Sequence, residues 1–184
     1  MQVPKGDIWV FGYGSLMWRP DFPHAETRPA LLHGYHRALC IYSVEYRGTY
    51  QSPGLVFGLD RGGSCRGLAF RVLEKDVKDV ISYLYEREMV TSVYRPRWLN
   101  IKIGEAQSKT TVPSYLFVTD PTHSQYTGKM SEDETIKIVL QGHGKAGSCL
   151  DYLSNTFEHL LQLGIHDRVL GKIVEKATAA NNSA

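Results

Sequence analysis

The stretch from Ile8 to Met17, which reads IWVFGYGSLM, joins a fully apolar run to a turn that two glycines punctuate. A short apolar run that ends at a glycine is typical of a buried β-strand. A glycine-punctuated turn after a strand can direct several backbone N–H groups towards one anion, such as a carboxylate or a phosphate. We therefore expect a strand over residues 8–11 and an anion-binding loop after it, with a plain glycine turn as the alternative.

The same stretch argues against the common nucleotide-binding folds. A dinucleotide-binding fingerprint, G-x-G-x-x-G/A, that begins with Gly12 and Gly14 would place its third small residue at Met17, whose side chain prevents close packing of a helix. The G-x-x-x-x-G-K-[ST] pattern of a phosphate-binding P-loop does not fit this stretch, and no run of βαβ units follows it. An α/β dinucleotide-binding fold is therefore excluded.

Outward from this stretch, the first two thirds of the chain is mostly strand, and helices are concentrated in the last third. Turn-forming residues 60–64 separate two strand-like runs and predict an antiparallel hairpin. Helix-capping patterns begin at Ser131 and Ser148, and a final helix is expected from about Asp167. This order predicts an α+β fold with a curled antiparallel or mixed sheet. About six strands are expected, over residues 8–11, 31–42, 55–59, 67–72, 97–103 and 114–119.

Composition sets the broad class of the protein. A length of 184 residues with 42% hydrophobic residues predicts one packed domain over residues 1–178, and the polar tail 179–184 is expected to be disordered. The 21 basic and 19 acidic residues leave a net charge of +2, too weak to favour binding of nucleic acid or of an anionic membrane. Three cysteines at unrelated spacings indicate a reducing compartment, and no signal peptide or membrane-spanning helix is recognisable. We therefore expect a cytoplasmic protein with a small-molecule partner.

One helix interrupts the strands, from about Lys75 to Glu88, and it carries the strongest candidate for catalysis. Its apolar positions lie at helical spacing, and a further step of four residues from Leu84 arrives at Glu88, which places that carboxylate on the core-facing stripe. Glu86 turns away and is expected to be solvated. Burial and the helix C-terminus both disfavour a negative charge, so we expect the pKa of Glu88 to rise above about 4.3. Such a carboxyl group is suited to general acid/base catalysis.

Other interpretations of single residues stay open beside this one. Glu88 could be an end-of-helix acid paired with Arg87 or Arg95, since charged residues are seldom fully buried. Cys65 lies in a G-x-C-x-G pattern that resembles a nucleophile elbow, although a hairpin is the wrong context for one. His33 and His36 would point to opposite faces of a strand, which argues against a metal site. The loop residue His143 could line a pocket or simply be exposed.

Three segments taken together resemble the ChaC-like glutathione-specific γ-glutamylcyclotransferases. They are FGYGSLMW at residues 11–18, YLYERE at residues 83–88 and GKAGSCLDYL at residues 144–153, and the resemblance runs from about residue 8 to residue 163. It implies a small mixed β-barrel with flanking helices. Many relatives carry Asn at the position of Cys149 and Lys at the position of Met89, so the chain looks like the bacterial-type branch.

The resemblance also implies an activity and a set of site residues. The glutamyl α-amine of glutathione would attack its own γ-amide and release 5-oxoproline and cysteinylglycine, without a metal or a cofactor. Glu88 would be the acid/base and Tyr152 a hydrogen-bond donor to the substrate. The loop formed by Tyr13, Gly14, Ser15 and Leu16 would bind the substrate through its backbone N–H groups, and the segment Arg47–Thr49 would meet the cysteinylglycine end.

Three alternative functions remain at this level. The same cyclisation could act on other γ-glutamyl amino acids or amines, because all of them share the glutamyl end. The chain could instead be a non-catalytic binding or regulatory domain linked to cation transport. A cysteine hydrolase that uses Cys65 is the third alternative.

Overall fold

The computed structural model describes residues 3–104 and 110–183. The chain forms two compact units, of which the first comprises Met1–Ala38 with Gly58–Asp120 and the second Leu39–Phe57 with Pro121–Ala184. Two long strands, β2 (Glu26–Ser43) and β3 (Gly54–Val72), each contribute residues to both units. The single domain expected over residues 1–178 stays a prediction.

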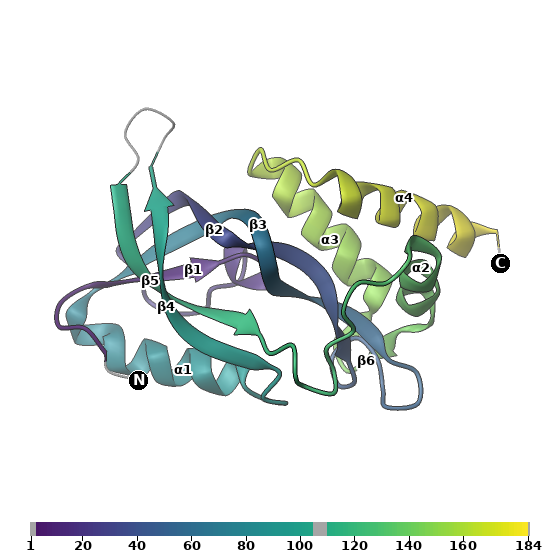
Figure 1. Ribbon diagram of the computed structural model, residues 1–184, viewed down its shortest axis with the longest axis horizontal. Helices are drawn as coiled ribbons and strands as arrows, with labels where there is room; N and C mark the ends of the chain where they lie inside the picture. Colours follow the sequence, from purple (N-terminus) through teal and green to yellow (C-terminus); the bar gives the residue numbers. More distant parts are fainter. Residues whose placement is uncertain (1–2, 105–109, 184) are drawn as a thin grey trace. The chain divides into compact units, whose positions relative to one another are not determined.

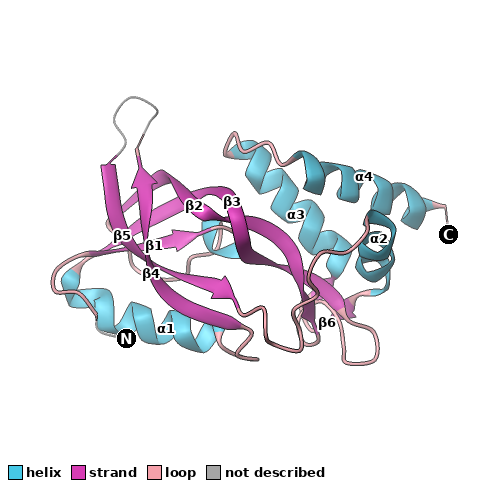
Figure 2. Cartoon of the chain, in the orientation of Figure 1, coloured by secondary structure: helices cyan, strands magenta, loops and turns pink. Residues whose placement is uncertain are grey.

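The sheet is a closed barrel with the strand order β1-β3-β2-β4-β5. Its other strands are β1 (Ile8–Gly12), β4 (Tyr94–Ile103) and β5 (Thr110–Thr119). Strand β1 runs antiparallel to β3 and parallel to β5, whereas β4 is antiparallel to both β2 and β5. The pairing is therefore mixed, and the α+β class with a mixed barrel is confirmed (Figure 2).

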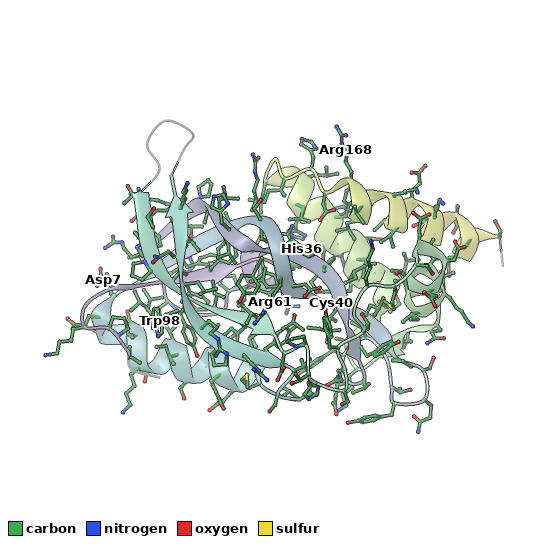
Figure 3. All side chains as sticks on the ribbon, viewed as in Figure 1. Asp7, His36, Cys40, Arg61, Trp98 and Arg168 are labelled. Carbon is green, nitrogen blue, oxygen red and sulfur yellow. The ribbon has the colours of Figure 1, made fainter. Side chains whose placement is uncertain are left out.

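The hairpin expected at residues 60–64 is wrong. Strand β3 continues through this segment, so two of the six expected strands form one and the barrel has five. Gly62 and Gly63 adopt φ values of +94° and +65°, which residues with a side chain rarely adopt. Both a tight turn and a β-bulge use such glycines, and here the strand continues through them without reversing. His36 of β2, labelled in Figure 3, lies beside this segment, with its Nδ1 3.1 Å from the carbonyl oxygen of Gly62.

The core of the first unit lies between the barrel strands and helix α1 (Val77–Glu88), which follows a short 3-10 turn, η2 (Glu74–Asp76). Figure 1 shows α1 alongside the barrel. Each fully buried apolar side chain stabilises a fold by about 1.5–3 kcal/mol, so this core fixes the helix firmly. Trp98 of β4, also labelled in Figure 3, packs on Tyr115 with ring centroids 5.2 Å apart. The buried cluster consists of Ile8, Val10, Leu16, Phe22, Phe70, Val72, Val77, Val80, Leu84, Tyr115 and Phe117.

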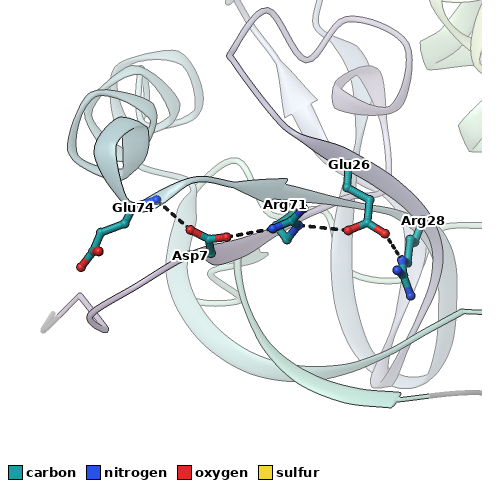
Figure 4. A network of polar contacts seen from close by, with 5 residues as sticks. All are labelled: Asp7, Glu26, Arg28, Arg71 and Glu74. Atoms are coloured by element: carbon teal, nitrogen blue, oxygen red, sulfur yellow. Dashed lines mark hydrogen bonds and ion pairs between the residues drawn. The ribbon is translucent and has the colours of Figure 1, made fainter.

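A chain of ion pairs lies on the surface of the first unit (Figure 4). The guanidinium of Arg71 pairs with Asp7 at 2.9 Å and with Glu26 at 3.0 Å. Glu26 also pairs with Arg28, and Asp7 accepts a hydrogen bond from the backbone N–H of Glu74 at 3.0 Å. These contacts connect the residue before β1 to strands β2 and β3 and to the start of η2.

The second unit contains helices α2 (Glu132–Gln141), α3 (Cys149–Gln162) and α4 (Arg168–Asn182), with the short strands β6 (His143–Gly144) and β7 (Gly147–Ser148) between α2 and α3. Ser131 forms the expected capping box with Glu134, and Ser148 and Asp167 cap α3 and α4. Helix α4 extends to Asn182, so the expected disordered tail is helical over its first four residues, 179–182. None of the helices among residues 3–104 and 110–183 has the length and apolar character needed to cross a membrane.

Candidate active site

The glycine-punctuated loop is a buried part of the first unit. Tyr13 and Leu16 are 8% and 6% exposed, and the turn continues into a 3-10 helix, η1 (Ser15–Met17). The backbone of β3 passes close to the loop, because a Cβ atom on Gly67 would lie 2.2 Å from the carbonyl oxygen of Gly12. A glycine at position 67 therefore permits the close approach that sets the position of the loop.

An arginine of β2 also holds this loop. Arg37 donates from Nε to the carbonyl oxygen of Tyr13 at 2.6 Å and from Nη2 to that of Arg66 at 2.7 Å. It thereby connects the start of the loop to strand β3. Sequence reasoning missed Arg37, because no motif marks a single arginine within a long strand.

Glu88 is the last residue of α1 and lies on the expected face of the helix. Val77, Val80 and Leu84 are buried, and the side chain of Glu88 on the same stripe is 19% exposed. Glu86 is exposed, which confirms that the two acids differ. Burial raises the pKa of Glu88 above its ordinary value, and the adjacent Arg87 guanidinium acts in the opposite direction. The expected direction of the pKa shift is confirmed, with burial as its main cause.

Arg87 connects Glu88 to the glycine loop. Its Nε lies 3.3 Å from Oε1 of Glu88, and its Nη2 donates to the hydroxyl of Ser15 at 3.2 Å. Its Nη1 donates to the carbonyl oxygen of Arg19 at 2.7 Å and to the Tyr83 hydroxyl at 2.8 Å. A planar guanidinium can hold several acceptors in fixed directions. The carboxylate and the loop hydroxyl are thus held by the same group.

The ion-pair interpretation of Glu88 is correct in part. Arg87 is its partner, whereas Arg95 pairs with Asp120 at 2.6 Å. The pair does not make Glu88 an ordinary surface acid, because the net effect of its surroundings still raises its pKa. The two interpretations therefore describe one arrangement, in which a half-buried carboxyl group has an arginine partner that also contacts the loop.

The remaining site residue from the sequence, Tyr152, belongs to helix α3 of the second unit. The guanidinium of Arg47 lies over its ring, with Cζ 5.0 Å from the ring centroid. The ring centroids of Tyr152 and Phe57 are 5.8 Å apart. Arg47 donates hydrogen bonds to the carbonyl oxygens of Ala146 and Ser148. The segment Arg47–Thr49 and the motif at residues 144–153 therefore meet within the second unit.

The other sequence candidates are not arranged for catalysis. Cys65 is 2% exposed within the continuous strand β3, whereas a nucleophile elbow requires a strand, a sharp turn and a helix. Cys149 is buried, and burial raises the pKa of its thiol to about 11, so it is not a reactive thiolate near neutral pH. Its Sγ donates to the carbonyl oxygen of Leu55 and accepts from the N–H of the same residue, each at 3.2 Å. His143 is exposed.

Comparison with known proteins is consistent with these features. The family model for ChaC-like protein matches residues 8–180. A glutathione-specific gamma-glutamylcyclotransferase of Escherichia coli (strain K12) is 32% identical over 180 residues, which cover 96% of this chain and 77% of the relative. The human glutathione-specific gamma-glutamylcyclotransferase 1 is 30% identical over 183 residues, covering 95% of this chain and 82% of the relative. A crystal structure of a glutathione-specific γ-glutamyl cyclotransferase from yeast has the same fold, with a TM-score of 0.88 at 20% identity over 98% of this chain and 99% of that chain.

Proposed function

The chain belongs to the family of ChaC-like proteins, and on that premise we propose that it is a γ-glutamylcyclotransferase that acts on glutathione. In the reaction, the α-amine nitrogen of the glutamyl unit forms a bond to the γ-carbonyl carbon. The bond from that carbon to the cysteine nitrogen breaks, and the products are 5-oxoproline and cysteinylglycine. The glutamyl ammonium nitrogen loses two protons to become the N–H of the lactam, and the departing amide nitrogen gains two to become the ammonium group of cysteinylglycine, so no further reactant is needed.

Glu88 is the proposed acid/base of this reaction. The α-amine is mostly protonated near neutral pH and cannot attack until a base has accepted its proton. A carboxyl group with a raised pKa accepts that proton more readily than an ordinary one and can return it to the departing nitrogen. A burial-induced rise in pKa is therefore the property that the proposed role requires.

The loop at residues 13–16 is the proposed binding site for the α-carboxylate of the glutamyl unit. The first N–H groups of a helical turn have no acceptor within that turn, so those of Ser15 and Leu16 suit an anionic ligand. Fixing the carboxylate there also fixes the neighbouring amine. Because the reaction is intramolecular, an enzyme that holds the folded conformer can gain effective molarities on the order of 10⁵ M or more.

Two further assignments complete the proposal. Tyr152 is a proposed hydrogen-bond donor to the substrate, by resemblance to the family motif at residues 144–153. We also propose a cytoplasmic location, because three buried thiols, Cys40, Cys65 and Cys149, suit a reducing compartment.

The observation that supports the function best is the shared guanidinium of Arg87, which holds the carboxylate of Glu88 and the hydroxyl of Ser15. The test is incubation of the purified protein with glutathione, followed by identification of the products by mass spectrometry. We expect equal amounts of 5-oxoproline and cysteinylglycine. A parallel panel of γ-glutamyl amino acids and amines, each assayed for 5-oxoproline, tests the substrate. The absence of 5-oxoproline from every compound would refute the function, whereas preferred turnover of another compound would refute only glutathione as the substrate.

A further inference from the structure

Arg87 makes more contacts than an ion pair with Glu88 requires. Its three nitrogens reach the carboxylate of Glu88, the hydroxyl of Ser15, the carbonyl oxygens of Arg19 and Pro20, and the Tyr83 hydroxyl. The side chain of Arg87 is 21% exposed, so these contacts form in a partly desolvated environment. Holding one side chain in this way costs conformational entropy, which the surrounding acceptors must offset.

The contact with Ser15 has a chemical consequence for the loop. A hydroxyl group has one proton to donate and lone pairs that accept. Because Arg87 donates to the Ser15 oxygen, the hydroxyl proton of Ser15 is left to point elsewhere, and an anionic ligand on the loop is a suitable acceptor. Arg87 thus orients a second kind of donor beside the backbone N–H groups.

The contact with Glu88 has a different consequence, which is electrostatic. A positive charge at 3.3 Å favours the ionised carboxylate and offsets part of the effect of burial on the pKa of Glu88. Arg87 has a second acidic partner, Asp21, which lies 3.6 Å from its Nη1. Tyr115 of β5 belongs to the same buried cluster as Leu84 of α1, and burial raises the pKa of its hydroxyl. On β4, Arg95 is paired with Asp120.

We propose that Arg87 is the positioning residue of the site, which fixes the carboxylate of Glu88 and the hydroxyl of Ser15 in one arrangement through a single guanidinium. This inference rests on the proposed cyclotransferase function and assigns it a residue whose role is neither to bind the substrate nor to transfer the proton. The planar fork supplies the geometry, and the positive charge offsets part of the rise that burial gives to the pKa of Glu88. These two contributions can be separated, because lysine keeps the charge and loses the fork.

The test compares two substitutions at position 87 with a matched substitution of Arg37, the other arginine that contacts the loop. In Arg87→Met both contributions are lost: we expect kcat for glutathione to fall by about 10²-fold, the cost typical of a misplaced reacting group. The acidic limb of the pH profile of kcat/KM should also move to higher pH, because Glu88 then stays protonated further up the pH scale. Arg87→Lys should lower kcat while the acidic limb stays near its wild-type position. Arg37→Met, which removes the contacts with Tyr13 and Arg66, should raise KM without moving the limb.

A measurement without substrate separates this inference from the proposed function. The pKa of Glu88 can be followed by NMR titration of protein labelled with ¹³C at glutamate side-chain carboxyls, and the signal can be assigned with Glu88→Gln. We expect the Glu88 signal to titrate at higher pH in Arg87→Met than in the wild type, and at nearly the wild-type pH in Arg87→Lys.

Two results would overturn the inference. One is an unchanged Glu88 titration together with an unchanged acidic limb in Arg87→Met, which would leave Arg87 with a purely structural role. The second is full kcat in Arg87→Lys, which would show that the planar fork is not needed. This result can be obtained even if Arg87→Met does not fold. If the wild type releases no 5-oxoproline from any γ-glutamyl compound, the proposed function fails, and the catalytic role of Arg87 falls with it.

Discussion

At the scale of single residues, two glutamates of the first unit show how surroundings decide the behaviour of the same side chain. Burial raises the pKa of Glu88, whereas a hydrogen bond from Arg28, supported by Arg71, lowers the pKa of Glu26. Sequence periodicity was sufficient to place Glu88 on the core-facing stripe and Glu86 in solvent, because helical spacing alone decides which face a residue occupies. It could not reveal the role of Arg87, because that depends on the loop which packs against α1.

The two glutamates should therefore give stability opposite dependences on pH. A folded-state pKa above the unfolded value means that stability falls as pH rises through it, and a folded-state pKa below the unfolded value means that stability falls as pH drops through it. Relative to the wild type, Glu88→Gln should thus gain stability on going from about pH 4 to about pH 7. Glu26→Gln should lose stability relative to the wild type on going from about pH 3 to about pH 5. Urea unfolding at these pH values provides the measurement.

The effect of Glu26→Gln should also shrink in high salt, since its ion pairs are close to solvent. The same sign of pH dependence in both variants would contradict the assigned shifts.

At the scale of elements, the helices were easier to predict than the strands. The caps at Ser131, Ser148 and Asp167 act locally, so the sequence alone marks where these helices begin. The hairpin predicted around Gly62 and Gly63 was wrong, because a turn and a bulge have the same local sequence pattern. The choice between them depends on the neighbouring strand β2, which is distant in sequence.

The close approach of β3 to the glycine loop gives a prediction at this scale. Gly67→Ala should displace Gly12 and the loop that follows, since the added Cβ would lie 2.2 Å from the Gly12 carbonyl oxygen. We expect a loss of stability of about 1–3 kcal/mol and a raised KM for glutathione. Steady-state kinetics, corrected for the folded fraction, provide the measurement.

The matched control is Gly62→Ala on the same strand. Its Cβ would meet no atom within 4 Å, but its φ of +94° strains a residue with a side chain, so we expect a similar loss of stability, of order 1–3 kcal/mol. Its KM should stay at the wild-type value. Equal KM values in both variants would show that the approach of β3 does not position the loop.

At the scale of the whole molecule, the structure divides into two compact units, whereas length and composition predict a single domain. β2 and β3 each supply residues to both units. Unfolding of these strands in one unit would therefore disturb the strand residues of the other unit. We therefore expect one cooperative unfolding transition. All three tryptophans, Trp9, Trp18 and Trp98, belong to the first unit, whereas three of the four α-helices in the described part of the chain belong to the second.

These reporters make the expectation easy to check. Tryptophan fluorescence follows the first unit, and far-ultraviolet circular dichroism follows mainly the helices of the second. The two signals should give the same midpoint and the same slope in urea. Two separate transitions would show that the units are independent domains.

The proposed function of the molecule depends on one proton-transferring carboxyl group, and a pair of substitutions on the same helix tests it most directly. Glu88→Gln is nearly isosteric but cannot accept a proton, whereas Glu86→Gln changes an exposed acid two residues away. The measurement is the rate of 5-oxoproline release from glutathione by each folded variant. We expect Glu88→Gln to lose the activity and Glu86→Gln to retain it. Wild-type turnover by Glu88→Gln, or an equal loss in both variants, would contradict the account.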